Sequence, residues 1–285
     1  MNLSSQNTPP PEPARGAALE ISDSSCEGVR FLTIYSPSLR GRGDVSVFAP
    51  AECDMLESVP VVLLLHGVYS SHWAWFFKGK AHRAAGSLIA ARQIRPMLLV
   101  SPSDGLFEQG SGYLNHSGRD YESWIVNDVL GRLPDAFPCV NRNSPVFVTG
   151  LSMGGYGALR LGAKYPSLFR GISAHSAVVS IDDLDTFLCK PFPKEELPHE
   201  ETDLLRWFVA HRSVLPPTRL DCGTGDPLLE ANRRFHRELQ LQHIDHLYAE
   251  FSGAHDWEYW SAHIADSLLF FEQILLATGR PDLRS

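Results

Sequence analysis

The chain has 285 residues, which is enough for one large α/β domain with a well-buried core. Hydrophobic residues make up 44% of it and charged residues 20%, and the formal net charge is −8 without any long basic run. This balance is ordinary for a globular protein and argues against nucleic acid or an anionic membrane as a partner.

The first residues read as a tail outside the folded domain. Residues 1–26 are rich in Ser, Pro and Ala, which predicts a flexible leader and places the domain at 27–285. Residues 1–28 lack the basic start and apolar stretch of a secretory signal, so we expect a cytoplasmic protein. No apolar run approaches the ~20 residues of a membrane helix.

The cysteines give no sign of a covalent or metal-bound framework. The five of them are scattered and form no Cys-x-x-Cys pair. An odd, dispersed set is typical of reduced structural thiols rather than of disulfides or a zinc site. We therefore expect no metal and no cofactor.

From residue 31 onward the pattern alternates between strands and helices. Residues 31–35 and 45–49 predict two antiparallel edge strands. The segments that follow predict buried strands at 61–65, 97–100, 146–149, 172–177, 220–222 and 244–251, and helices at 80–93, 125–133 and 258–278. This alternation predicts an α/β fold, a doubly wound and mostly parallel sheet with helices on both faces.

Residues 181–216 interrupt this rhythm. The segment is rich in proline and charge and shows no clear period. We interpret it as a small cap-like insertion over the carboxyl edge of the sheet, with a long surface loop as an equal alternative. The sequence leaves open whether this insertion is a mobile lid.

The most informative segment is Gly-Leu-Ser-Met-Gly at residues 150–154. A short apolar strand leads into it and a helical pattern leads out, which is the context of a nucleophile elbow. Such a turn lifts one serine hydroxyl, here that of Ser152, above the sheet in a strained backbone conformation. Gly150 and Gly154 suit it because side chains there would collide.

A serine nucleophile needs a base, and the base needs an acid that orients it. With an elbow of this kind the acid and then the histidine follow the serine along the chain. His255 lies in the loop after the last predicted strand, and Asp226 lies in the loop after the preceding one. An Asp before Pro227 is also a good helix cap, and Asp221 is the alternative acid, although it lies within the predicted strand.

The oxyanion of an acyl-transfer intermediate needs two backbone N–H donors. We expect one from Met153 and the other from Val68, in the loop after the strand at 61–65, although that loop could be a simple turn. Tyr69, His72 and Trp73 crowd the same loop, together with Trp75. They could line an acyl pocket and bind substrate, or equally pack against the edge strands.

These motifs together resemble the putative-esterase family of α/β-hydrolases, which includes esterase D (S-formylglutathione hydrolase), tributyrin esterases, feruloyl and acetyl-xylan esterases and mycolyltransferases. The matching segments are 35–39, 64–67 with Trp75, 150–158, 222–226 and 253–260. The resemblance implies a serine carboxylesterase with Ser152, Asp226 and His255 as catalytic residues and Met153 and Val68 as oxyanion donors. Ala254 stands where relatives often carry Gly, and residues 181–216 match no subfamily.

The expected activity is hydrolysis of a small-molecule ester, short-chain or aryl (acetyl or feruloyl type), through an acyl-enzyme. An acyltransferase with the same triad and an S-formylglutathione-type thioesterase are alternatives. A binding protein without activity would be favoured by an incomplete triad, whereas all three positions are filled here. The sequence leaves open whether the chain forms a homo-oligomer.

Overall fold

A nine-stranded sheet forms the centre of the protein. The computed structural model describes residues 19–116, 118–194 and 197–278. The strand order is β1-β2-β3-β5-β4-β8-β9-β10-β11. The strands are β1 (Leu19–Cys26), β2 (Val29–Ser36), β3 (Gly41–Phe48), β4 (Val61–Leu65), β5 (Leu98–Pro102), β8 (Val146–Leu151), β9 (Phe169–His175), β10 (Thr218–Gly223) and β11 (Leu247–Phe251). All pairs from β5 to β11 are parallel, which confirms the predicted mostly parallel sheet.

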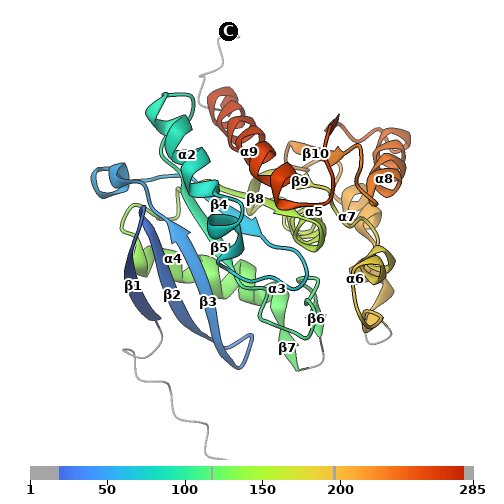
Figure 1. The fold of residues 1–285 in the computed structure, drawn as a ribbon, viewed down its shortest axis with the longest axis horizontal. Helices are drawn as coiled ribbons and strands as arrows, with labels where there is room; N and C mark the ends of the chain where they lie inside the picture. Colours follow the sequence, from blue (N-terminus) through green and yellow to red (C-terminus); the bar gives the residue numbers. More distant parts are fainter. Residues whose placement is uncertain (1–18, 117, 195–196, 279–285) are drawn as a thin grey trace, which may run out of the picture.

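Helices cover both faces of this sheet, as Figure 1 shows. One face packs against α1 (Ala74–Phe77), α2 (Ala81–Ala90) and α9 (Trp257–Thr278). The other packs against α3 (Tyr121–Ser123), α4 (Leu130–Ala136), α5 (Met153–Lys164), α7 (Leu204–Ala210) and α8 (Leu229–Leu241). A π-helical turn at Trp124–Val129 joins α3 to α4, and β6 (Asn115–His116) pairs with β7 (Arg119–Asp120). The apolar sheet residues thus divide between two cores, one on each face.

Although α9 runs for 22 residues, no helix in the described part of the chain combines the length and the apolar character needed to cross a bilayer.

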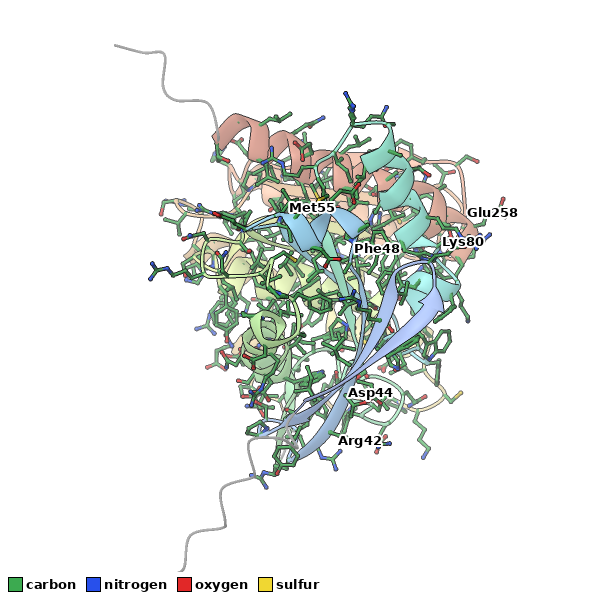
Figure 2. All side chains as sticks on the ribbon, turned by 90° about the vertical axis from the view of Figure 1, so that its left-hand side faces the viewer. Arg42, Asp44, Phe48, Met55, Lys80 and Glu258 are labelled. Atoms are coloured by element: carbon green, nitrogen blue, oxygen red, sulfur yellow. The ribbon has the colours of Figure 1, made fainter. Side chains whose placement is uncertain are left out.

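The antiparallel end of the sheet differs from the prediction. β2 and β3 pair antiparallel as expected, but β1 adds a further strand outside β2, and β3 continues into the sheet through β5. The predicted leader is therefore too long, because residues 19–26 belong to the sheet, while residues 1–18 lie outside the described residues. This part of the sheet faces the viewer in Figure 2, where Arg42, Asp44 and Phe48 mark β3.

The segment at 181–216 folds into short helices. It contains a 3₁₀ turn (Ile181–Thr186), α6 (His199–Thr202) and α7. Two side chains of α5 hold α6: the Tyr156 hydroxyl donates to the Thr202 carbonyl at 3.0 Å, and the buried Arg160 guanidinium pairs with Glu201. The insertion is thus tied to the helix that follows the nucleophile elbow.

Candidate active site

Ser152 occupies a sharp turn between β8 and α5. Its φ and ψ are 55° and −121°, a conformation that is costly for a residue with a side chain. Three backbone bonds hold it, from Ser152 N–H to the His175 carbonyl (3.1 Å) and to the Ser152 carbonyl from the N–H groups of Val178 (3.0 Å) and Tyr156 (3.1 Å). A Cβ on Gly150 or on Gly154 would lie 2.1 Å from a carbonyl oxygen. Glycines at these two places therefore permit the turn.

The structure brings Ser152, His255 and Asp226 together. His255 Nε2 lies 3.0 Å from Ser152 Oγ, and His255 Nδ1 lies 2.8 Å from Asp226 Oδ2. A carboxylate only accepts hydrogen bonds, so Nδ1 carries the proton and Nε2 is free to accept one from the serine hydroxyl. The arrangement is that of a nucleophile, a base and an orienting acid.

The loops that carry Asp226 and His255 are bonded to each other. Thr224 N–H donates to the Phe251 carbonyl, and Gly225 N–H donates to the Gly253 carbonyl, both at 2.8 Å. Asp226 is buried, and its other oxygen accepts from Leu228 N–H at 2.8 Å. This leaves Oδ2 for the imidazole. The alternative acid Asp221 contacts His175 instead of His255.

The loop after β4 lies against the elbow, where an oxyanion hole is expected. A Cβ on Gly67 would come within 3.3 Å of Ser152 Cβ, and one on Gly110 would touch the side chains of both Met153 and Val68. Val68 and Met153 are thus near neighbours. Among the described residues, no protein acceptor is recorded for the N–H of either one. This agrees with the expectation that both N–H groups serve a ligand, which stays a prediction.

His66 fixes the direction of one of these donors, a role that the sequence alone did not reveal. His66 Nε2 accepts from Asp104 N–H at 3.0 Å, so the proton sits on Nδ1, which donates to the Gly67 carbonyl at 2.8 Å. The carbonyl of Gly67 and the N–H of Val68 belong to one planar peptide and point in opposite directions. Holding the oxygen therefore aims the N–H. Burial lowers the pKa of His66, which favours this neutral form.

The three aromatic residues expected near the substrate have different surroundings. His72 Nδ1 bonds Ser46 Oγ on β3 at 2.7 Å, and its ring meets Phe31 of β2 edge-on. Trp73 lies under the Lys78 ammonium. The contacts of His72 agree with packing against the antiparallel strands, the other interpretation open from the sequence, whereas the contact of Trp73 is with the residue that follows α1.

Tyr69, in contrast, reaches the insertion. Its exposed hydroxyl donates to the Gln109 side chain and accepts from Cys189 N–H at 2.9 Å. Gln109 Oε1 accepts from the same Cys189 N–H at 2.6 Å. These bonds connect three segments: the loop after β4, the segment after β5 and the insertion at 181–216.

Phe187 is a residue of the site that sequence reasoning missed. Its ring stacks on the His255 imidazole with centroids 4.5 Å apart and planes 16° from parallel. Trp260 meets the same imidazole edge-on at 5.0 Å. The insertion thus supplies one wall of the site. No motif marks Phe187, and only its place within residues 181–216 could have drawn attention to it.

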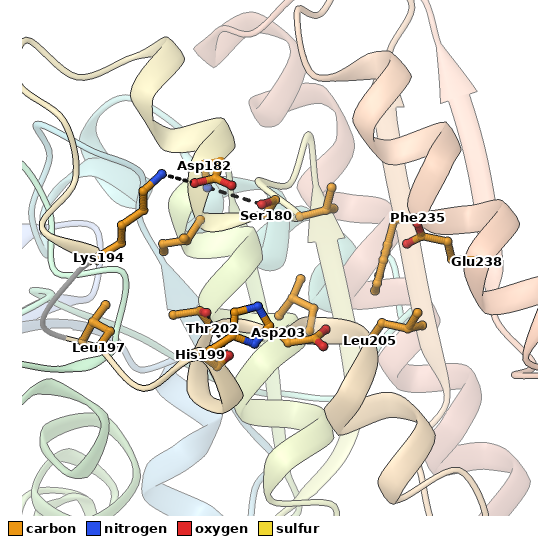
Figure 3. Close-up of a pocket in the computed structure, with 13 residues that line it drawn as sticks. Ser180, Asp182, Lys194, Leu197, His199, Thr202, Asp203, Leu205, Phe235 and Glu238 are labelled. Atoms are coloured by element: carbon orange, nitrogen blue, oxygen red, sulfur yellow. Dashed lines mark hydrogen bonds and ion pairs between the residues drawn. The ribbon is translucent and has the colours of Figure 1, made fainter.

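A cavity of about 590 Å³ lies beside the insertion, bounded by α6, α7 and α8 (Figure 3). Lys194 pairs with Asp182 at its rim, and Phe235 and Leu205 form part of its wall. None of the three clustered residues Ser152, Asp226 and His255 lines it.

Known proteins resemble this chain over most of its length. The model of the family described as putative esterase matches residues 36–271. The acetyl esterase of Caldicellulosiruptor saccharolyticus is 26% identical over 237 residues, which are 76% of this chain and 85% of that protein. A solved ferulic acid esterase has a TM-score of 0.75 at 22% identity and covers 90% of this chain and 99% of its own. A fluorophosphonate-binding serine hydrolase of Staphylococcus aureus has a TM-score of 0.74 at 22% identity, covering 85% and 97%.

Proposed function

Because this chain belongs to the putative-esterase family, we propose that it hydrolyses carboxylic esters through an acyl-enzyme formed on Ser152. The observation that carries this proposal is the continuous chain of hydrogen bonds from Ser152 Oγ through His255 to Asp226, with lengths of 3.0 and 2.8 Å. Bonds of this length let a proton leave the serine as its oxygen attacks.

In the first half of the reaction, Ser152 Oγ attacks the ester carbonyl while His255 Nε2 takes its proton. Asp226 keeps the imidazole in the required tautomer and stabilises the imidazolium that forms. The developing oxyanion accepts from the N–H groups of Met153 and Val68. One such donor is worth about 3 kcal/mol of transition-state stabilisation.

The tetrahedral intermediate then collapses. His255 gives its proton to the leaving alcohol, and the acyl group remains on Ser152 as an ester. In the second half, His255 takes a proton from water, which attacks the acyl carbonyl. The acid leaves, and Ser152 recovers its proton. No group beyond these side chains and water is needed for the atoms and charges to balance.

We propose short acyl or aryl groups as the acyl part of the substrate, because the curated relative is an acetyl esterase and one structural neighbour is a ferulic acid esterase. A thioester is the second candidate, because S-formylglutathione hydrolase from Agrobacterium tumefaciens shares the fold with a TM-score of 0.72. A panel of p-nitrophenyl esters from acetate to octanoate, methyl ferulate and S-formylglutathione would rank them by kcat/KM.

The test of the mechanism is Ser152→Ala. Loss of the nucleophile should lower kcat on p-nitrophenyl acetate by roughly 10⁵-fold or more, with an unchanged circular dichroism spectrum. Ser70→Ala, which alters a serine of the adjacent loop, serves as the matched control. A folded Ser152→Ala protein that retained wild-type activity would rule out the proposed acyl-enzyme.

A further inference from the structure

A second Ser–His–Asp cluster lies inside the protein, next to the first. Ser267 Oγ is 2.7 Å from His175 Nε2, and His175 Nδ1 is 2.8 Å from Asp221 Oδ2. The same atoms follow in the same order as in the cluster of Ser152, where the distances are 3.0 and 2.8 Å, although the contact of His175 Nδ1 with Asp221 is a charge contact without hydrogen-bond geometry. All three of these inner residues are fully buried. No substrate can reach them, so a second active site is excluded.

The serine and the aspartate of the inner cluster have further partners. Ser173 Oγ lies 2.7 Å from Ser267 Oγ, the Tyr259 hydroxyl donates to Asp221 Oδ1 at 2.7 Å, and the Arg219 guanidinium pairs with Asp221. Burial and the nearby carboxylate raise the pKa of Tyr259, which keeps its phenol protonated as a donor. Burying such groups costs desolvation energy, and apolar residues often stabilise a core as well. Stability alone is therefore a weak reason for this cluster.

Backbone hydrogen bonds connect the inner cluster to the turn that carries Ser152. The His175 carbonyl accepts the Ser152 N–H at 3.1 Å, and the Asp221 carbonyl accepts the Ser176 N–H at 2.7 Å. The cluster is thus built from the strand ends that hold the nucleophile elbow in its strained conformation.

A second set of contacts leads to the base. The Tyr259 ring lies against Gly253, where a Cβ would come 2.5 Å from Tyr259 Cδ2. Gly253 has a φ of 147° and stands two residues before His255, and its carbonyl accepts Gly225 N–H of the loop that carries Asp226. The Tyr259 hydroxyl thus bonds Asp221, while the ring packs against the loop that carries His255.

We propose that Tyr259, held by Asp221, is a positioning residue. It places the loop of His255 so that His255 Nε2 lies within hydrogen-bond distance of Ser152 Oγ. The Tyr259 hydroxyl is the link between the inner cluster and this loop. Without it the ring keeps its packing on His263 and the Tyr259 N–H keeps its bond to Asp256. The ring loses its anchor on Asp221, however, so it holds Gly253 and the Nε2 to Oγ distance less tightly. Misplacement of reacting groups by about 1 Å can cost up to ~100-fold in rate. This inference rests on the proposed function of Ser152.

Tyr259→Phe tests the proposal, because it removes the hydroxyl and keeps the ring. On p-nitrophenyl acetate we expect kcat to fall about tenfold while KM stays within about twofold, since the change affects the alignment of His255 and leaves Phe187 and the loop after β4 in place. The rate of labelling by a fluorophosphonate should fall by a similar factor. Tyr165→Phe is the matched control: it removes a tyrosine hydroxyl bonded to the buried Glu122 carboxylate, far from His255 in sequence, and should leave kcat unchanged.

A double-mutant cycle separates positioning from general destabilisation. Gly253→Ala should push the same ring and lower kcat, and the combination with Tyr259→Phe should cost much less than the product of the two effects. Wild-type kcat in a folded Tyr259→Phe protein, or fully multiplicative effects in the cycle, would overturn the positioning role. If Ser152→Ala stayed active, the proposed function itself would fail, so the two failures are distinguishable.

Discussion

The cluster of Ser152, His255 and Asp226 and the cluster of Ser267, His175 and Asp221 contain the same side chains in the same order at similar distances, but the contact of His175 Nδ1 with Asp221 lacks the hydrogen-bond geometry of His255 Nδ1 with Asp226. They differ in the backbone beneath the serine and in the partners around them. Ser152 has a φ of 55° at the start of α5, whereas Ser267 lies within α9. Asp226 leaves its Oδ2 to His255 alone, whereas Asp221 is shared by His175, Arg219 and Tyr259.

This comparison shows that hydrogen-bond distances within a Ser–His–Asp set do not by themselves define a reactive site. Reaction also needs access for substrate and free donors for the oxyanion, for which we propose the N–H groups of Val68 and Met153. The inner cluster has no access. Its bonds hold neighbouring strand ends together instead.

Of the two aspartates, Asp226 should have by far the larger effect on kcat, whereas Asp221 should affect stability. Asp226→Asn should lower kcat by about 10⁴-fold, because an amide that donates to Nδ1 leaves the imidazole in the wrong tautomer. The fold should be retained, since Asp226 Oδ1 alone caps Leu228 N–H. Steady-state kinetics on p-nitrophenyl acetate with a thermal melt measures both. A decrease below tenfold would argue that another group orients His255.

Asp221 should matter for stability at acid pH. Burial by itself would raise the pKa of Asp221, but the attraction of His175 and Arg219 and the bond from Tyr259 outweigh it and lower the pKa to about 2. A carboxyl with a depressed pKa stabilises the fold fully above its unfolded value near 4, and this contribution is lost as the pH falls toward 2. The free energy of unfolding should therefore fall by about 2 kcal/mol from this group alone.

Urea unfolding of the wild type and of Asp221→Asn at pH 5, 4 and 3 measures this effect. The variant should be destabilised at pH 5, because Arg219 loses its buried partner, and should show a shallower decline with acid. Parallel declines in the two proteins would mean that Asp221 has an ordinary pKa in the folded state.

The cluster of Ser152 and the inner cluster also differ at Phe187. This ring of the insertion stacks on His255, whereas among the described residues no ring of the insertion stacks on His175. Phe187→Ala removes one wall of the site. It should therefore raise KM for an aryl ester such as methyl ferulate by about tenfold, and KM for p-nitrophenyl acetate should increase less. Phe77→Ala, which removes an exposed ring stacked on Phe31, is the matched control. Equal KM values for both esters in Phe187→Ala would exclude a role in selecting the acyl group.

The smallest effect is expected at His72. Its bonds and ring contacts are with β2 and β3, so His72→Ala should change KM for p-nitrophenyl acetate by less than about twofold. Unfolding should occur at slightly lower temperature. A tenfold increase in KM would show that His72 binds substrate after all.

The sequence predicted the features that depend on local pattern and chain order. Five consecutive residues are enough to predict the turn at Ser152, and His255 and Asp226 each follow a recognisable strand. β1 was missed because its pairing depends on backbone bonds to β2, whereas Leu19 and Ile21 offer only a short apolar pattern. The stacking of Phe187 depends on the path of an insertion without periodicity.

The inner cluster could not be predicted for a different reason. Ser267 and His175 are 92 residues apart and lie on a helix and a strand whose packing decides whether they meet. Nothing in either segment distinguishes them from other buried polar residues. Tertiary structure alone reveals that they form a second copy of the same arrangement.

The central claim is that only one of the two serines reacts. Stoichiometric fluorophosphonate treatment followed by intact mass measurement and peptide mapping tests it directly. We predict one adduct per chain, on the peptide that contains Ser152, and none on the peptide that contains Ser267. An adduct on Ser267, or an unlabelled Ser152 in an active protein, would contradict the account.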